Sequence, residues 1–455
     1  MADIRLASFK AYDIRGRVPD ELNEAMAYDI GRAYVAQMRP GGAVVVGRDV
    51  RETSEAFSRA VIKGVTDAGA DAVDIGLCGT EMVYFASSLH GMGGGIMVTA
   101  SHNPRDYNGI KLVHANARPI SADTGLMDME ERVRTGDLPG VSAHPGTMTT
   151  RDVMDDYVKR ILSFVDVSVL KPLKIVANPG NGCAGPAFDR LAERLPFEVV
   201  RVQFDPDGSF PNGIPNPLLP ENRAVTASEV RKANAAFGVA WDGDYDRCFL
   251  FDQRGSFIEG YYLVGVLARQ ILAGNPGGKI VHDPRLTWNT IELVREAGGE
   301  TVLSKSGHSF IKEKMRETGA VYGGEMSAHH YFRDFSYADS GMIPWLLVAQ
   351  ELSLTGKTLS SLVDERIDRY PCSGEINTTV EYPDAVIDRI RTHYADKASD
   401  LSELDGISLE FGSRWRFNIR KSNTEPVIRL NVETAGNKSL LEEKTDEILS
   451  LIRWS

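Results

Sequence analysis

The sequence has few cysteines and no long apolar run, and these absences exclude several classes of protein. Its four cysteines, Cys78, Cys183, Cys248 and Cys372, lie far apart and form no CxxC pair, so their spacing argues against a disulfide framework and against a zinc site. No apolar stretch approaches the roughly 20 residues that cross a bilayer. The N-terminus places charges among its apolar residues, so we expect no secretory signal and a cytoplasmic location.

Basic residues are outnumbered by acidic ones, 51 Lys and Arg against 63 Asp and Glu. The formal net charge of −12 argues against nonspecific nucleic-acid binding, which needs a basic face, so any anionic ligand must be held by local basic clusters. At 455 residues the chain is too long for one ordinary core and should divide into roughly three or four domains. Its 42% hydrophobic and 25% charged residues are typical of a soluble globular protein.

One pattern occurs three times along the chain. A strand runs into a polar or glycine-containing loop and then a helix in AVVVGRDVRETS from Ala43, LKIVANPGNGCAG from Leu173 and GKIVHDPRLTWNT from Gly278. A second strand follows each, and then a third that ends in a polar loop: GGIMVTASHNP, GVAWDGDYDR and AVYGGEMSAHH. Strands that alternate with helices predict βαβ units with right-handed crossovers. Because ligands of open α/β sheets gather at the carboxyl ends of strands, the three loops are candidates for one shared site.

The C-terminal part follows a different pattern. After about residue 366 come INTTVEY, a helix from Asp384, then ISLEF, WRFNIRK, PVIRLNV and a final amphipathic helix, which predict a small α+β domain. We therefore expect three related α/β domains that contain βαβ units and mixed sheets, followed by the α+β domain, all arranged around a central cleft. The expected domain bounds are 1–150, 151–252, 253–366 and 367–455.

The first polar loop, TASHNP at 99–104, follows a glycine-rich strand and precedes DYNGIK, which ends at Lys111. We expect Ser101 to be exposed here. A serine next to a histidine says little alone, since neighbouring residues seldom form a nucleophile and base pair, and the loop by itself favours a plain turn. Three known motifs fail on spacing: TASHN is not GxSxG, GMGGGI lacks the third glycine of GxGxxG, and nothing matches GxxxxGK followed by Ser or Thr.

The second polar loop, DGDYDR at 242–247, directly follows the apolar GVAW. Carboxylates at every second residue of an extended chain point to one side, and Gly243 lets the backbone wrap, so the three aspartates can converge on a hard divalent cation. An EF-hand is excluded because its sixth position would be Arg247 and its twelfth Gln253. A solvated acidic turn remains the alternative for this loop alone. Arg247 beside the carboxylates suggests that a phosphate is held there too.

Two further loops combine polar groups in useful ways. In GGEMSAH, Glu325 and Ser327 place a carboxylate and a hydroxyl at alternate positions, a pair suited to vicinal sugar hydroxyls. RKSNTEP from Arg420 joins a fixed positive charge to two hydroxyls and a tight turn, which suits a phosphate dianion, although alone it could be a basic hairpin turn. Two smaller groups are further candidates for ligand binding: Lys10, Tyr12 and Arg15 in FKAYDIRG, and Lys305 and His308 in KSGHSF. In isolation each is more often a solvated charge than a ligand.

Together these loops resemble the α-D-phosphohexomutase family over all four expected domains. TASHNP is similar to its phosphoserine loop, DGDYDR to its magnesium loop, GEMSAH to its sugar-binding loop and RKSNTEP to its phosphate-binding loop, with FKAYDIRG, DYNGIK and SGHS as smaller segments. GEMSAHHYFRDF resembles the phosphomannomutase/phosphoglucomutase branch, and bacterial phosphomannomutases most. The departures are Lys10 where many relatives have arginine, Ala328 where many have glycine, and Lys421 where a small residue is common.

The resemblance implies a phosphomannomutase that interconverts mannose 1-phosphate and mannose 6-phosphate, and also accepts glucose phosphates. The reaction would run through phosphorylated Ser101, a hexose 1,6-bisphosphate intermediate and Mg²⁺. The implied metal ligands are Ser101, Asp242, Asp244 and Asp246. The implied catalytic residues are Ser101, Lys111, Arg247, His308, Arg15 and His102. The implied substrate-binding residues are Tyr12, Lys10, Lys305, Arg285, Glu325, Ser327, His329, Arg420, Ser422, Asn423 and Thr424.

The general base and the overall activity have alternatives. Lys111 is one candidate base because neighbouring cations could lower its pKa, and His308 is a second. The rival activities are a phosphoglucomutase, a metal-dependent sugar phosphatase with an aspartyl nucleophile in DGDYD, and a silent sugar-phosphate-binding protein. We expect a phosphorylated hexose as the only partner, with no nucleic acid, membrane or obligate protein partner.

Overall fold

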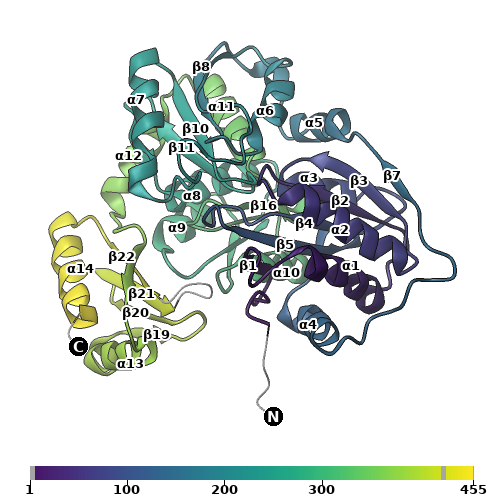
Figure 1. Ribbon diagram of the computed structural model, residues 1–455. Coiled ribbons are helices and arrows are strands. Elements are labelled where there is room, and N and C mark those ends of the chain that lie inside the picture. The colour runs from purple at the N-terminus through teal and green to yellow at the C-terminus, as the bar shows by residue number, and fades with distance from the viewer. Residues whose placement is uncertain (1–5, 422–426, 454–455) are drawn as a thin grey trace. The chain divides into compact units, whose positions relative to one another are not determined.

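The computed structural model of the protein describes residues 6–421 and 427–453 (Figure 1). The chain forms two compact units. Unit 1 comprises Met1–Phe257 and Phe332–Gly356, and unit 2 comprises Ile258–Tyr331 and Lys357–Ser455. None of the helices within the described residues combines the length and the apolar character that a membrane span needs.

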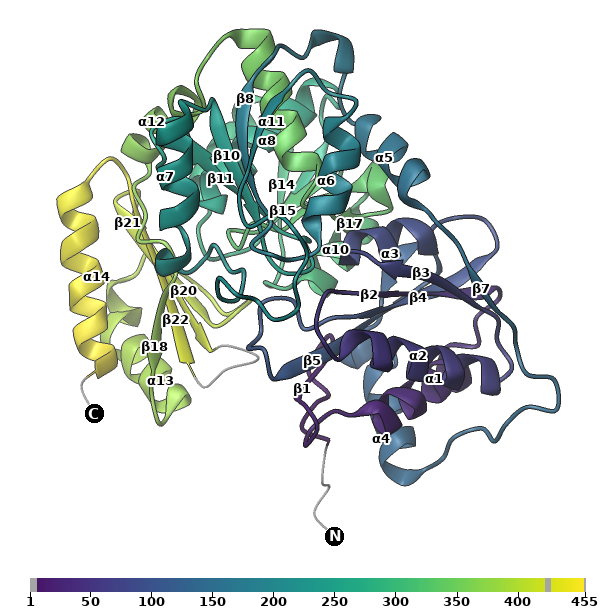
Figure 2. The ribbon, with the colours of Figure 1, turned by 45° about the horizontal axis from the view of Figure 1, so that its top comes forward.

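Unit 1 begins with a mixed sheet in the strand order β1-β5-β4-β2-β3-β7, with β6 paired to β5. Helices α1, α2 and α4 cover one face of this sheet and α3 the other (Figure 2). The strands are β1 (Ile14–Arg17), β2 (Ala43–Arg48), β3 (Ala72–Leu77), β4 (Met92–Val98), β5 (Tyr107–His114), β6 (Arg118–Pro119) and β7 (Met148–Thr150). The helices are α1 (Glu24–Met38), α2 (Ser54–Asp67), α3 (Thr80–Ser87) and α4 (Leu126–Thr135).

A second sheet of unit 1 has the order β12-β11-β10-β8-β9. On one face Val230 of α7 packs into a core with Phe251. On the other face the ring of Phe188 from α6 lies 5.5 Å from Trp241 and 5.1 Å from Trp345 of α11. The strands of this sheet are β8 (Lys174–Asn178), β9 (Glu198–Arg201), β10 (Phe237–Trp241), β11 (Cys248–Asp252) and β12 (Phe257–Ile258). The short strand β17 (Ala338–Asp339) follows later in unit 1 and does not belong to this sheet. The helices are α5 (Met154–Leu162), α6 (Ala184–Ala192), α7 (Ala224–Ala233) and α11 (Ile343–Thr355).

Unit 2 contains a third sheet with the order β14-β13-β15-β16 and a C-terminal sheet with the order β18-β22-β21-β20-β19. Apolar residues of α13 and α14 form one core with the C-terminal strands. The strands are β13 (Lys279–His282), β14 (Glu300–Leu303), β15 (Tyr322–Gly324), β16 (His330–Phe332), β18 (Ile376–Thr379), β19 (Asp400–Ser402), β20 (Ile407–Phe411), β21 (Trp415–Lys421) and β22 (Val427–Thr434). The helices are α8 (Gly260–Ala273), α9 (Trp288–Glu296), α10 (His308–Thr318), α12 (Leu359–Arg369), α13 (Pro383–Tyr394) and α14 (Lys438–Arg453).

The predicted repeat is confirmed by the strand order. In each of the first three sheets the first strand of the repeat is central, with the second and third strands parallel to it on either side: β3-β2-β4, β9-β8-β10 and β14-β13-β15. The C-terminal part is the expected α+β fold, with the three-residue edge strand β19 as an element that the sequence did not predict. The equivalent third strands, β4, β10 and β15, end in the three polar loops, so the repeat places those loops at equivalent sheet edges.

Candidate active site

Two of the polar loops meet within unit 1. The loop at 99–104 follows β4 and the loop at 242–247 follows β10, and the Ser101 hydroxyl lies 2.9 Å from Oδ2 of Asp242. A Cβ at Gly243 would lie 2.5 Å from the carbonyl oxygen of Ser101. The close approach of the two backbones therefore requires glycine at this position.

Ser101 is buried, with 1% of its surface exposed, so the expectation of an exposed serine is wrong. Its φ of 49° is unusual for a residue other than glycine. Its N–H donates to the Thr99 hydroxyl at 2.8 Å, and its own hydroxyl lies 2.9 Å from Nδ1 of His102. The serine is buried because this turn directs its hydroxyl toward the aspartate loop, away from solvent.

Arg51, a residue that was not predicted from the sequence, holds the serine loop through hydrogen bonds to its backbone. Its side chain is 2% exposed, and its two terminal nitrogens donate to four backbone carbonyls, those of Ser101 at 2.9 Å, Asn103 at 2.6 Å, Pro104 at 2.7 Å and Tyr107 at 2.9 Å. The only signal in the sequence was an arginine in the loop after the first strand of the repeat, GRDVR. A rigid planar fork with several donors suits such multiple capping better than an ammonium group does.

The three aspartates of the second loop form a candidate cation site. Asp242, Asp244 and Asp246 are 0%, 0% and 2% exposed, and one carboxylate oxygen from each lies within 4.8 Å of the others. Burial, followed by the charge of Asp246, raises the pKa of Asp242 to about 7. Oδ1 of Asp244 is buried and accepts no hydrogen bond from the residues that the structure describes. Buried carboxylates with an unused oxygen fit a hard divalent cation, which takes oxygen ligands.

Lys111 and Thr80 complete the surroundings of the aspartates. Lys111 lies on β5 opposite Met97 of β4, and its ammonium donates to Asp244 at 2.7 Å and Asp246 at 2.6 Å. Thr80, the first residue of α3, donates its hydroxyl to Oδ2 of Asp244 and its N–H to the Asp244 carbonyl at 3.1 Å. Sequence reasoning missed Thr80, which lies in no polar motif.

The reason given for Lys111 as a general base does not hold in this arrangement. Burial lowers its pKa, but the charges of Asp244 and Asp246 outweigh burial and raise the pKa above the ordinary lysine value. We expected neighbouring cations to dominate, whereas the two carboxylates contact the ammonium directly. The base assignment, to Lys111 or to His308, stays a prediction.

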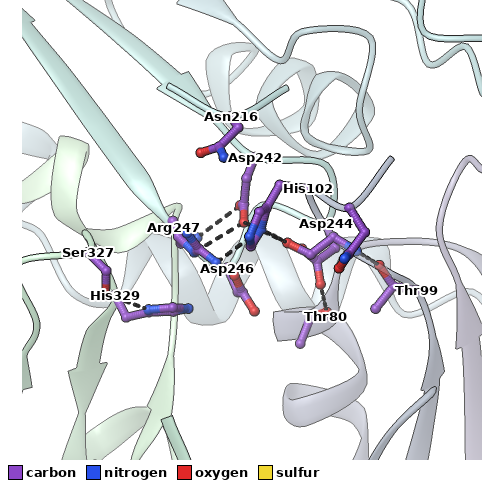
Figure 3. A network of polar contacts seen from close by, with 12 residues as sticks. Thr80, Thr99, His102, Asn216, Asp242, Asp244, Asp246, Arg247, Ser327 and His329 are labelled. Atoms are coloured by element: carbon purple, nitrogen blue, oxygen red, sulfur yellow. Dashed lines mark hydrogen bonds and ion pairs between the residues drawn. The ribbon is translucent and has the colours of Figure 1, made fainter. Parts of the chain in front are cut away.

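Three further predicted catalytic side chains contact these loops, and Figure 3 shows two of them, His102 and Arg247. Arg247 contacts Nδ1 of His102 at 3.0 Å and Oδ2 of Asp242 at 3.3 Å. Burial, followed by the charge of Arg247, lowers the pKa of His102 well below its usual value, so His102 is neutral near pH 7. Arg15 donates to the side chain of Asn103 at 2.6 Å, which ties it to the serine loop.

Lys10 and Tyr12 lie just before β1. The Lys10 ammonium donates to the Ala7 carbonyl at 2.6 Å, and Tyr12 is half-buried. The structure therefore places them in the same segment as Arg15, and their substrate-binding roles stay predictions.

The predicted sugar loop in unit 2 is held by fixed hydrogen bonds. Glu325, 2% exposed, accepts from the Tyr331 hydroxyl at 2.6 Å and from the N–H of Gly307 at 2.8 Å, so it is tied to the KSGHS segment. The Ser327 hydroxyl lies 3.2 Å from Nδ1 of His329 (Figure 3). In the KSGHS segment, Lys305 is exposed and His308 is the half-buried first residue of α10.

Arginines gather around one carboxylate in unit 2. Nη1 of Arg285 lies 3.1 Å from Oε2 of Glu375, Nη2 of Arg420 lies 3.6 Å from the same oxygen, and Nη1 of Arg429 lies 3.5 Å from Oε1. Arg285 and Arg420 were predicted to bind substrate, whereas Glu375 and Arg429 were not identified. The other predicted members of the phosphate loop, Ser422, Asn423 and Thr424, lie outside the described residues.

Comparison with known proteins covers the chain almost from end to end. Residues 6–138, 155–255 and 259–370 match the profiles "Phosphoglucomutase/phosphomannomutase, alpha/beta/alpha domain" I, II and III, and residues 375–451 match the C-terminal domain of the same family. A Xanthomonas campestris protein described as "Phosphohexose mutases" is 58% identical over 448 residues, which cover 98% of this chain and 99% of that protein. A phosphomannomutase of Escherichia coli K12 is 53% identical over 454 residues, with 98% and 99% coverage.

A solved structure gives the same result. The crystal structure of a phosphoglucomutase/phosphomannomutase family protein from Burkholderia thailandensis is 34% identical, with a TM-score of 0.88 over 99% of this chain and 98% of that chain. The four profiles, the relatives and the shared fold all agree with the four polar loops. The chain therefore belongs to the phosphoglucomutase/phosphomannomutase family of phosphohexomutases, isomerases that transfer phosphate intramolecularly.

Proposed function

We propose that this phosphohexomutase interconverts mannose 1-phosphate and mannose 6-phosphate through phosphorylated Ser101, and that it accepts glucose phosphates as well. The observation that carries the proposal is the 2.9 Å contact between the Ser101 hydroxyl and Asp242 in a buried group of three carboxylates. A serine held against so much negative charge suits a phosphate carrier completed by a cation. Preference for mannose is supported by relatives described as phosphomannomutases, such as the Escherichia coli protein at 53% identity.

We propose that Mg²⁺ is held by Asp242, Asp244 and Asp246 together with an oxygen of the serine phosphate. Two observations support this ligand set: Oδ1 of Asp244 is available as a ligand oxygen, and the raised pKa of Asp242 indicates a carboxylate short of positive charge. When bound, the ion would neutralise charge on the transferring phosphoryl group. Arg247, 3.0 Å from His102 beside the serine, would neutralise further charge on the same group.

The transfer itself needs one nucleophile and one base. The sugar hydroxyl attacks phosphorus, the bond from phosphorus to Oγ of Ser101 breaks, and the hydroxyl proton passes to a base, for which Lys111 and His308 are the candidates. This gives the hexose 1,6-bisphosphate. The intermediate then presents its other phosphate to Ser101: Oγ of Ser101 attacks that phosphorus and loses its proton, the bond from phosphorus to the sugar oxygen breaks, and the sugar oxygen takes up a proton, which completes the isomerisation. Arg15 would steady the serine loop through Asn103, 2.6 Å away.

The remaining residues would hold the sugar. We propose that Glu325 and Ser327 bind O3 and O4, since both lie in one loop and Arg285 contacts both, at 3.3 Å and 3.4 Å. Arg420, Ser422, Asn423 and Thr424 would hold the phosphate that is not reacting. Lys10, Tyr12, Lys305 and His329 would add further substrate contacts. The domain bounds 1–150, 151–252, 253–366 and 367–455 are part of the same proposal.

Enzyme labelled on its phosphate tests the mechanism. After mixing with unlabelled mannose 1-phosphate, label should pass into bisphosphate and mannose 6-phosphate within one turnover, and Ser101→Ala should abolish turnover. If label stays on the protein while product accumulates, the phosphoserine mechanism is wrong. Net phosphate release would instead indicate the phosphatase, and ligand binding without turnover the silent binding protein. A higher kcat/KM for glucose 1-phosphate than for mannose 1-phosphate would make phosphoglucomutase the main activity.

A further inference from the structure

The arginine cluster of unit 2 contains an internal anion. Glu375 lies directly before β18 and is 11% exposed, and its carboxylate contacts Arg285, Arg420 and Arg429 at 3.1 to 3.6 Å. Burial alone would raise the pKa of Glu375, but the three arginines outweigh burial and lower it. The carboxylate is therefore ionised at neutral pH, at the place where the proposed function requires phosphate affinity.

Strand register explains why a carboxylate is needed there. Arg420 on β21 and Arg429 on β22 are paired directly opposite each other in the antiparallel ladder. Like charges in this position repel, and both side chains are largely withdrawn from water, at 7% and 21% exposed. Among the residues that the structure describes, Asp405 is the other acid in contact with Arg420, and its oxygen lies 3.9 Å from Nε. Glu375 is the closer carboxylate and contacts both arginines, so it relieves their repulsion.

The third arginine has other partners. Arg285 makes two contacts with Asp283, from Nε at 3.0 Å and from Nη2 at 2.9 Å, and a third with Glu325 at 3.3 Å. Two carboxylates therefore already neutralise Arg285. Arg420 and Arg429 both contact Glu375, so an incoming phosphate dianion must share these two guanidinium groups with a fixed negative charge. Such sharing weakens the binding of an anion.

We propose that Glu375 is an internal counter-ion of the phosphate-binding arginines, which holds Arg420 and Arg429 together when phosphate is absent and weakens their grip on the phosphate that is not reacting. The inference rests on the proposed function, in which Arg420 binds that phosphate. A bisphosphate that must leave this position and return in the opposite orientation requires a site whose affinity for phosphate is low enough to allow release. Glu375 would set that grip through the arginines, as a positioning residue that does not touch the reacting atoms.

Glu375→Gln tests the inference because it removes the charge and keeps the size. We expect the inhibition constant for inorganic phosphate and the KM for mannose 1-phosphate to fall by about three- to tenfold, since one like charge near the dianion is lost. We expect kcat to fall as well, because reorientation of the bisphosphate slows. Transfer of label from Ser101 to the first bisphosphate should keep its wild-type rate, which a general loss of structure would not allow.

Three further variants sharpen the result. Glu375→Asp keeps the charge and withdraws it by one methylene group, so its phosphate inhibition constant should lie between those of Glu375→Gln and wild type, and this variant serves even if the glutamine protein folds poorly. Glu410→Gln is the matched control: it neutralises an acid 3.3 Å from a different arginine, Arg416, and should leave the constant unchanged. In an Arg420→Ala background, Glu375→Gln should lose most of its effect.

The outcomes separate the inference from the function on which it rests. A wild-type enzyme with no mutase turnover would overturn the proposed function. With a wild-type enzyme that turns over, an unchanged or raised phosphate inhibition constant in both Glu375 variants would overturn the counter-ion role. A lowered phosphate inhibition constant in Glu410→Gln would overturn the counter-ion role too, because the effect would then not be specific to the arginine cluster.

Discussion

Arg51→Lys is the most informative single change in unit 1, because it keeps the charge and removes the fork. The arginine side chain donates to four carbonyls of the serine loop and its continuation, whereas lysine carries one nitrogen with three donors. At least one carbonyl must therefore lose its partner, and of the four residues that supply these carbonyls Ser101 is the most deeply buried. Leaving a buried acceptor unsatisfied costs about 1–3 kcal/mol, which is a sizeable part of the roughly 5–15 kcal/mol of a typical domain.

The larger effect should be on catalysis. Arg51 holds the loop in which Ser101 has a φ of 49°, and a shift of about 1 Å in a reacting group can cost about a hundredfold in rate. We expect kcat to fall by about 10- to 100-fold while the KM for mannose 1-phosphate changes by less than about threefold. The small change in KM follows because none of the sugar-binding residues proposed for unit 2 is altered.

The assay combines steady-state kinetics, with bisphosphate activator present, and thermal melting. Arg105→Lys is the matched control, since Arg105 lies in the same loop region but is exposed and contacts the side chain of Glu52, at 2.7 Å. It should behave as wild type. A lowered melting temperature with wild-type kcat would show that Arg51 serves stability alone, and a raised KM with unchanged kcat would also refute the positioning argument.

Three other changes have defined outcomes. Asp244→Asn should sharply lower both Mg²⁺ affinity in calorimetry and turnover, because it removes one of three buried carboxylates. Arg420→Ala should raise the KM for mannose 1-phosphate by about ten- to a hundredfold, from a lost charge-assisted contact of about 1.5–3 kcal/mol, with Mg²⁺ affinity unchanged. Burial raises the pKa of Glu81 from 4.5 to about 8 in the folded protein, so its stabilising effect is complete below 4.5 and lost as pH rises to 8. Chemical denaturation should show wild type losing stability relative to Glu81→Gln across that window; parallel pH profiles would contradict this.

The repeated fold was predictable because its signals are local. Apolar strands such as 43–48 and 174–178 lead into loops and helices in the same order three times, and the βαβ rule then determines which strands are neighbours. The aspartate loop was also predictable, because alternate carboxylates in DGDYD converge without any distant residue. Edge strand β19 was not, since three residues at 400–402 carry too little pattern.

The missed residues share a different property: their roles come from partners far away in the sequence. Arg51 contacts carbonyls about 50 positions along the chain, and Thr80 contacts Asp244 across 164 positions. Glu375 is brought to the arginines by the pairing of β18 with β22 and of β22 with β21. The error over the exposure of Ser101 has the same origin, since the residues that bury it belong to another sheet. The cytoplasmic location and the substrate preference depend on no such contact and stay predictions.

The two charged clusters are built on one electrostatic principle. Asp244 and Asp246 are partly neutralised by a cation of the protein itself, the Lys111 ammonium, at 2.7 and 2.6 Å. Arg420 is likewise partly neutralised by an anion of the protein, the Glu375 carboxylate, at 3.6 Å. Each cluster can therefore remain buried without its ligand, since an uncompensated buried charge is costly. A ligand that enters such a cluster exchanges partners instead of neutralising bare charges, so its binding is weaker and its release faster. In the proposed mechanism, in which a bisphosphate is bound, released and bound again in reverse within one turnover, moderate affinity for phosphate speeds the cycle.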